Sequence, residues 1–160
     1  MTVRIFRAPM RARDRDLDQF VGARFGVSNG LVGTGDELET VPDDLQEALL
    51  AATTQHGLKA GRMLERFADL PDGVFVWTQT GADEYRLGKI DGPWRYEASA
   101  DADRTGIHHV RPAEWLDRTF DSGEIPPAVA ETFARGGRNF QGTNDSPAEK
   151  LTASIWAAHV

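Results

Sequence analysis

The chain has 160 residues, 40% hydrophobic and 27% charged, which fits one folded domain with an ordinary core and excludes a disordered chain. It contains no cysteine, so disulfides, thiolate catalysis and cysteine-ligated zinc are excluded as well. Its formal net charge of −7 argues against a protein that clamps nucleic acid regardless of sequence, because such binding depends on Lys and Arg neutralising phosphates.

The charges are unevenly distributed along the chain. Residues 1–24 carry six basic and three acidic side chains, whereas residues 36–72 carry three basic and nine acidic ones. The sequence therefore predicts a small basic face on an acidic body. The chain holds no apolar run near the roughly 18 residues of a membrane span, and its first residues do not resemble a secretory signal. We expect a cytosolic protein that makes no contact with a membrane.

The first half of the chain predicts strands and helices in alternation. Val3 and Ile5 alternate with Arg4, so the segment Thr2–Ala8 is expected to form a half-buried strand. A second, short strand is expected over Leu31–Thr34, between glycines that allow tight turns. The spacing of apolar residues predicts helices over Asp14–Phe25, Val41–Leu50 and Leu58–Leu70.

The stretch from Asp72 to Leu116 holds three of the four tryptophans and both tyrosines. Runs of apolar residues separated by turn residues predict strands over Val74–Thr80, Glu84–Ile90, Trp94–Ala98 and Ile107–Leu116, with a loop over Ser99–Gly106. Trp94 and Tyr96 alternate with charged residues, which places both rings on one face of a strand. The sequence therefore predicts a sheet with an aromatic face.

The last part of the chain predicts two helices. The first follows Pro126 and Pro127 and buries an apolar stripe over Val129–Phe133, and the second covers Ala148–Ala158. Between them, two arginines flank two glycines in a turn at residues 135–138. We expect residues 1–141 to form the domain, with residues 142–160 as a linker and a C-terminal helix that packs on it.

Three motifs between Pro71 and Trp115, PDGVFVWT, YRLGKIDGPWRYE and GIHHVRPAEW, resemble the PUA-like superfamily, and within it EVE-like and restriction-associated domains. The likeness extends over residues 1–141 in architecture and is specific over residues 72–116. It implies an α+β fold in which a small mixed β-barrel is flanked by short helices. It also implies that the protein binds DNA or RNA and holds a flipped, modified base in an aromatic cage, in defence against foreign DNA or in recognition of RNA modification.

The residues of this chain can support such a site. Stacking on aromatic rings contributes about 1–3 kcal/mol per base, which offsets the few kcal/mol needed to unstack it. The expected ligand-binding residues are Trp77, Trp94, Tyr96, Trp115, His109, Arg111, Ser28 and Asn29. The expected phosphate-binding residues are Arg135, Arg138, Asn139 and Gln141. Two competing interpretations are that Trp77 belongs to the core and that the two arginines lie solvated at a helix end.

Two other functions stay open. A related PUA-like branch includes suspected RNases, so His108 or His109 could act as acid and base with Arg111 on the phosphate. A protein-interaction module would instead use the two helices expected in the acidic segment, Asp43–Leu50 and Leu58–Leu70.

No catalytic residue is assigned, because the carboxylates are dispersed and no nucleophile lies in a histidine motif. Neighbouring strand residues point to opposite faces, so His108 and His109 do not readily ligate one ion. We therefore expect no metal site and no cofactor. The expected assembly is a monomer or a weak homodimer.

Overall fold

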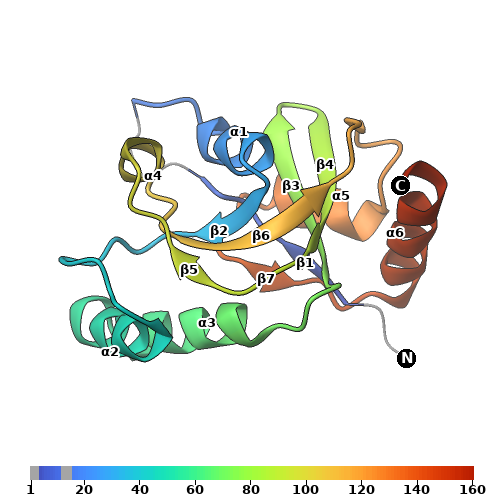
Figure 1. The fold of residues 1–160 in the computed structure, drawn as a ribbon. Helices are drawn as coiled ribbons and strands as arrows, with labels where there is room; N and C mark the ends of the chain where they lie inside the picture. The colour runs from blue at the N-terminus through green and yellow to red at the C-terminus, as the bar shows by residue number, and fades with distance from the viewer. Residues whose placement is uncertain (1–3, 12–15) are drawn as a thin grey trace.

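The structure, a computed structural model, describes residues 4–11 and 16–160, which form a mixed sheet with helices around it (Figure 1). Its strands are β1 (Ile5–Arg7), β2 (Leu31–Thr34), β3 (Phe75–Gly81), β4 (Glu84–Ile90), β5 (Arg95–Tyr96), β6 (His109–Trp115) and β7 (Gln141–Gly142). Its helices are α1 (Val21–Ser28), α2 (Leu45–His56), α3 (Leu58–Asp69), α4 (Ala100–Thr105), α5 (Pro127–Ala134) and α6 (Ser146–His159).

The sheet runs in the order β2-β6-β4-β3-β1-β7, with β5 paired to β6 beside this path. Only β1 and β3 are parallel among the described strand pairs. The sheet is strongly curled, and Thr34 of β2 and Gly142 of β7, from its two terminal strands, line the same cavity. No described pairing joins β2 to β7, so the barrel stays open along this seam. The predicted α+β class, with a small mixed barrel-like sheet and flanking helices, is confirmed.

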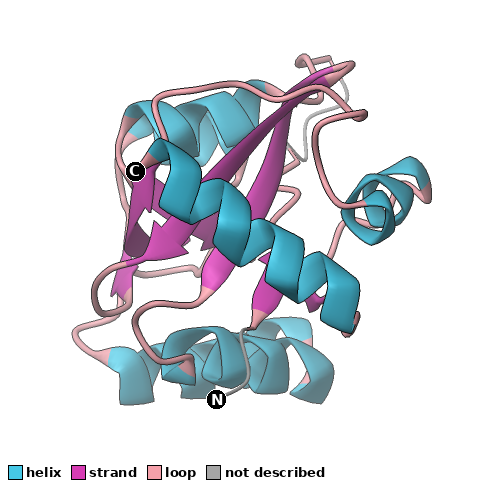
Figure 2. Cartoon of the chain, turned by 90° about the vertical axis from the view of Figure 1, so that its right-hand side faces the viewer, coloured by secondary structure: helices cyan, strands magenta, loops and turns pink. Residues whose placement is uncertain are grey.

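The two faces of the sheet belong to separate cores. Strand alternation sends Val74 and Val76 to the first core and Phe75 and Trp77 to the second. The first core also takes in side chains from α1, α2, α3 and α4. The second is covered by α5 and α6, and Figure 2 shows α6 lying across the front of the sheet. No described helix is long and apolar enough to cross a membrane.

Most predicted elements are confirmed, with shifts at their ends. The strands at residues 31–34 and 84–90 have the expected bounds. The first helix begins at Val21 rather than Asp14, which lies outside the described residues, as do the first two residues of the expected strand Thr2–Ala8. The predicted linker is shorter than expected because α6 begins at Ser146, where the Asp145 carboxylate accepts the Ala148 N–H at 2.8 Å.

The loop predicted over Ser99–Gly106 is wrong, because this segment contains α4. The Ser99 hydroxyl caps the helix by accepting the Ala102 N–H at 3.1 Å. Gly106 ends it in the left-handed conformation, at a φ of 78°, which glycine adopts without strain. Caps at both ends thus stabilise a helix that buries only Ala102 and Thr105.

Candidate functional site

A cavity of about 460 Å³ lies at the seam, between the two terminal strands and helix α3. This volume is within the range of small-ligand sites, which is roughly 300–1,000 Å³. We call it the seam cavity. It is lined by Arg4, Phe6, Thr34, Lys59, Met63, Arg66, Phe67, Leu70, Asn139, Phe140, Gln141 and Gly142.

Helix α3 presents one face to the seam cavity. Lys59, Met63, Arg66 and Phe67 are separated by four, three and one residues, which keeps them on one side of a helix with 3.6 residues per turn. Leu70, directly after the helix, also lines the cavity. The same face therefore combines apolar groups with two cations.

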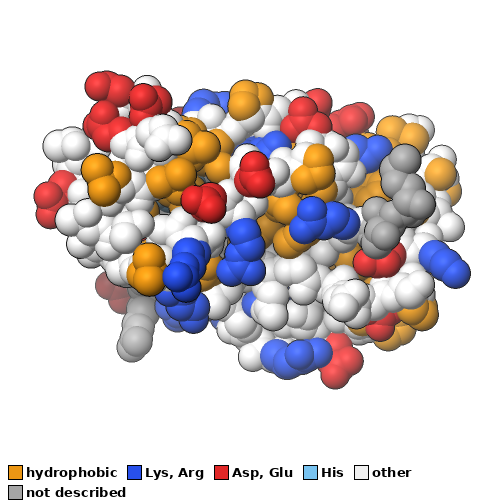
Figure 3. Space-filling view, turned by 90° about the horizontal axis from the view of Figure 1, so that it is seen from below, with side chains coloured by type: hydrophobic (Ala, Val, Ile, Leu, Met, Phe, Trp, Pro, Cys, Tyr) orange, Lys and Arg blue, Asp and Glu red, His pale blue; other side chains and the backbone are white. Residues whose placement is uncertain are grey.

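The seam cavity is basic although the protein is acidic. Arg4, Lys59 and Arg66 line it, and no acidic side chain among the described residues does. All three basic residues of the acidic segment 36–72 lie on α3. Figure 3 looks at the side of α2 and α3, and Lys and Arg side chains gather across the middle of this face. The local charge therefore favours an anion.

Three phenylalanine rings form one wall of the seam cavity. Phe6 and Phe140 are stacked, with ring centroids 5.1 Å apart and an interplanar angle of 12°. Buried Phe67 meets Phe140 edge-on at 5.0 Å, and the Arg4 guanidinium lies 5.3 Å from the centroid of Phe6. Because Phe6 and Phe140 stay partly exposed, they offer ring faces on which a planar group can stack.

Arg7 fixes the segment that carries Phe140. Its buried guanidinium donates to the carbonyl oxygen of Asn139 at 3.0 and 3.2 Å and to the side-chain oxygen of Gln141 at 2.9 Å. It also donates to the carbonyl and hydroxyl oxygens of Thr132 in α5, at 3.0 and 2.9 Å. The pKa of Arg7 is lowered, mainly because the guanidinium is buried and to a smaller extent because the positive charge of Arg135 lies nearby. Sequence reasoning missed Arg7 because its role depends on pairing between β1 and β7.

The predicted phosphate-binding residues are divided by the structure. Asn139 and Gln141 line the seam cavity. Arg135 and Arg138 are exposed and line neither described cavity, and Arg135 lies 3.6 Å from Glu131 one turn earlier on α5. The basic groups at the seam come instead from Arg4, directly before β1, and from Lys59 and Arg66 of α3.

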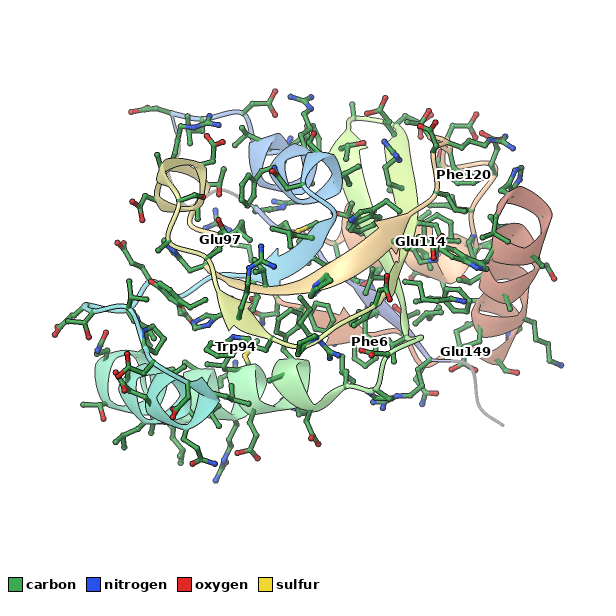
Figure 4. The ribbon with its side chains drawn as sticks, in the orientation of Figure 1. Phe6, Trp94, Glu97, Glu114, Phe120 and Glu149 are labelled. Atoms are coloured by element: carbon green, nitrogen blue, oxygen red, sulfur yellow. The ribbon has the colours of Figure 1, made fainter. Side chains whose placement is uncertain are left out.

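The structure brings the rings of Trp94, Tyr96 and His109 together. The Trp94 and His109 rings are nearly parallel at 6.0 Å, and Tyr96 meets His109 edge-on at 5.4 Å. Tyr96 also stacks on His108 at 5.2 Å with an interplanar angle of 9°. In Figure 4 Trp94 lies beside α2 and α3, whereas Phe120 lies on the other side, toward α6.

The polar atoms of this cluster bind the protein itself. The Trp94 indole donates to His109 Nδ1 at 3.2 Å, so the proton of neutral His109 is on Nε2, which donates to the Asp36 carbonyl at 3.0 Å. The Tyr96 hydroxyl accepts the Leu38 N–H at 3.0 Å. The cluster therefore holds the segment 36–38 in place.

A second, more open hollow of about 550 Å³ lies beside Trp94 and Tyr96. Its lining includes Asp43 and Asp44 at the start of α2, and Arg95 is its single basic residue among those described. Two carboxylates repel phosphate, so this hollow suits a nucleic-acid backbone less well than the seam cavity does.

Trp77 lies apart from these rings. It is 1% exposed in the second core, meets Phe120 edge-on at 5.9 Å, and donates from its indole to the Thr152 hydroxyl at 3.0 Å. The sheet separates it from Trp94, which packs against the first core. The competing interpretation of Trp77 as a core residue is thus the one that fits.

The remaining predicted ligand-binding side chains also have structural contacts. Trp115 lies over Gly88, where a Cβ would come within 2.5 Å of the ring, and its indole donates to the Leu31 carbonyl at 3.0 Å. Ser28 and Asn29 lie exposed at the end of α1, where the Asn29 amide donates to the Phe25 carbonyl at 2.8 Å. None of these three side chains lines the seam cavity.

Arg111 is 3% exposed and stabilises the end of α3. It donates to the carbonyl oxygens of Gly92, Phe67 and Leu70, and to the Asp72 carboxylate at 3.0 Å. Burial lowers its pKa, and Asp72 opposes this shift. The RNase alternative loses support. The Arg111 guanidinium already donates to oxygens of the protein, and His108 and His109, each 1% exposed, are shielded from a substrate.

The buried imidazole of His109 makes the stability of the fold sensitive to acid. Burial lowers the pKa of His109 from 6.5 to about 4. The unfolded chain therefore takes up a proton between these pH values that the folded chain does not. The free energy of unfolding should therefore decrease as the pH is lowered from 6.5 to about 4, by at most about 1.4 kcal/mol per pH unit.

This dependence is measurable by urea unfolding at a series of pH values. We expect His109→Gln, which keeps an amide donor and acceptor but does not titrate, to lose less stability than the wild type between pH 6.5 and about 4. Equal losses in the two proteins would show that His109 is not the responsible group.

No family model matches the chain, and no curated protein matches it. Among solved structures, it is similar to the YTH domain of the Zygosaccharomyces rouxii MRB1 protein, crystallised in complex with N6-methyladenosine RNA. The two share 12% identity, the match covers 98% of this chain and 86% of that chain, and the TM-score is 0.46.

Proposed function

We propose that the protein binds single-stranded DNA or RNA and takes one nucleobase into the seam cavity. One observation carries the proposal: three phenylalanine rings and three cations line a cavity of about 460 Å³ on a protein with a formal net charge of −7. A base stacks on an outward ring face of the Phe6–Phe140 pair, which contributes about 1–3 kcal/mol. Arg4, Lys59 and Arg66 bind the phosphates on either side of it.

A single strand suits this site better than a duplex. A paired base must first leave its stack, at a cost of a few kcal/mol, and a strand without a partner avoids most of that cost.

The three cations around the cavity can neutralise only a few phosphates of the bound strand. The affinity should therefore fall with salt, with a slope of about −0.7 per phosphate contacted.

We extend the proposal to a methylated base. The seam cavity contains the apolar side chains of Met63 and Leu70 beside the phenylalanine rings. A methyl group buried against such a lining contributes about 0.8 kcal/mol, or about fourfold in affinity. A methylated base should thus bind more tightly than its unmodified counterpart.

The test is fluorescence anisotropy of short labelled single strands, with unmodified or methylated bases, at two salt concentrations. Lys59→Gln and Arg66→Gln should each weaken binding about fivefold to tenfold for every sequence and lower the salt slope. Arg62→Gln is the matched control, because Arg62 is an exposed cation on the same helix outside the cavity lining.

Equal effects of all three substitutions would indicate diffuse attraction to α3 and would contradict the seam cavity as the site. Failure of every strand to bind would reject the proposed function. The exposed apolar side chains Val41, Leu50 and Leu58, which are 59%, 70% and 59% exposed, would then favour the protein-interaction alternative.

A further inference from the structure

A buried histidine nitrogen outside the seam cavity lacks a hydrogen-bond partner. His108 is 1% exposed, and its Nδ1 lies 2.9 Å from the Glu97 carbonyl oxygen. Because a carbonyl only accepts, Nδ1 carries the proton and Nε2 presents its lone pair. This Nε2 has no hydrogen-bond partner among the described residues. A buried acceptor left in this way is costly, so a ligand at this atom is favoured.

Two carboxylates lie next to this lone pair. Asp103 Oδ1 is 3.7 Å from His108 Nε2, and Glu37 supplies a third oxygen donor. The three donor atoms all lie within 4.8 Å of one another. Gly106, in the left-handed conformation, turns the chain back from α4 and allows Asp103 and His108 to approach.

We propose that Glu37, Asp103 and His108 bind a divalent first-row transition metal ion, with Zn²⁺ as the preferred ion. Imidazole nitrogen and carboxylate oxygen bind zinc at about 2.0–2.2 Å, which puts the ligand atoms of a tetrahedral site about 3.4 Å apart. The 3.7 Å separation of His108 and Asp103 is close to this value. Both carboxylates are exposed, so small side-chain rotations complete the approach.

The surroundings of His108 match those of a metal-bound histidine. Its Nδ1–H donates to a backbone carbonyl, which fixes the ring orientation and leaves Nε2 as the ligand atom. His108 and His109 are neighbours on the chain and do not readily share one ion. This site uses only His108, while His109 faces the Asp36 carbonyl.

Metal binding ties the segment after β2 to α4 and to the residue before β6. That segment joins β2, whose Thr34 lines the seam cavity, to helices α2 and α3. It is already held by the hydrogen bonds of Leu38 and Asp36 to the aromatic cluster. Zn²⁺ should therefore raise the midpoint of thermal unfolding, because it binds the folded chain and finds no assembled site in the unfolded one.

Isothermal titration of the untagged, EDTA-treated protein with Zn²⁺ tests the site. We expect one ion per chain and an affinity order in which Zn²⁺ exceeds Mn²⁺. Asp103→Asn and Glu37→Gln should each lower Zn²⁺ affinity tenfold or more, as losses of coordinating groups do. Asp101→Asn and Glu39→Gln, exposed acids nearby in the sequence but outside the donor set, should leave it unchanged.

A ¹⁵N NMR spectrum of the histidine side chains gives a direct readout. Zn²⁺ should shift the His108 Nε2 resonance and leave Nδ1 protonated. Because His108 is buried, His108→Gln could unfold the protein, and neither measurement needs that variant. Absence of Zn²⁺ binding, or binding that persists in the Glu37→Gln, Asp103→Asn double variant, overturns the proposal.

Discussion

Arg7→Met is expected to reduce the affinity for single-stranded nucleic acid at least tenfold and to lower the free energy of unfolding by about 1–3 kcal/mol. The stability loss follows because the variant leaves the Thr132 carbonyl, a buried acceptor, without its donor. The affinity loss follows because the guanidinium also binds Asn139 and Gln141, the neighbours of Phe140. Phe140 then loses its fixed position against Phe6.

Arg138→Met is the matched control for this prediction. Arg138 is exposed in the same turn and lines neither described cavity, so its loss should leave both stability and binding nearly unchanged. Urea unfolding measures the stability, and anisotropy measures the affinity. If Arg138→Met weakened binding more than Arg7→Met, the phosphates would bind at the glycine turn of residues 135–138 instead.

Trp77→Ala is expected to destabilise the fold by about 3–5 kcal/mol, the range for truncating a buried tryptophan. Trp77 is 1% exposed and contacts Phe120, and its indole donates to Thr152. The milder Trp77→Phe removes the hydrogen bond but keeps most of the volume. It should lower the free energy of unfolding by about 1–3 kcal/mol, the cost of an unpaired buried hydroxyl.

Binding separates the two interpretations of this residue. Because Trp77 lies on the α6 side of the sheet, Trp77→Phe should bind single strands with unchanged affinity. Trp77→Phe with wild-type stability but lost affinity would show instead that Trp77 forms a wall of the binding site.

The sequence predicts an element well where local residues determine it. The strand Glu84–Ile90 lies between two turns that each contain a glycine, Gly81 before it and Gly92 after it, and its bounds are as expected. Helix α4 was missed because ADADRT has no apolar period, and its caps carry the stability. Strand β7 was missed for another reason: Gln141 and Gly142 form a strand only by pairing with β1, more than 130 residues earlier.

The candidate site was harder to predict than the fold. Its groups come from separate segments, and only the curl of the sheet brings Phe6 next to Phe140 and α3. Tryptophan and arginine side chains are common in nucleic-acid sites, which is why the sequence predicts a site at these residues. In the structure, however, Trp77 lies in the second core and Trp115 packs over Gly88. One usable signal was present: the acidic segment 36–72 confines its three basic residues to a single helix.

Methionine methyl NMR shows whether a base enters the seam cavity. Met63 lines the cavity, whereas Met10 is 2% exposed in the first core and serves as an internal reference. A short single strand with a methylated base should shift the Met63 methyl resonance saturably through the ring current of the bound base, and should leave Met10 in place. A strand that binds by anisotropy while the Met63 methyl resonance stays unshifted would show that the base does not enter the seam cavity.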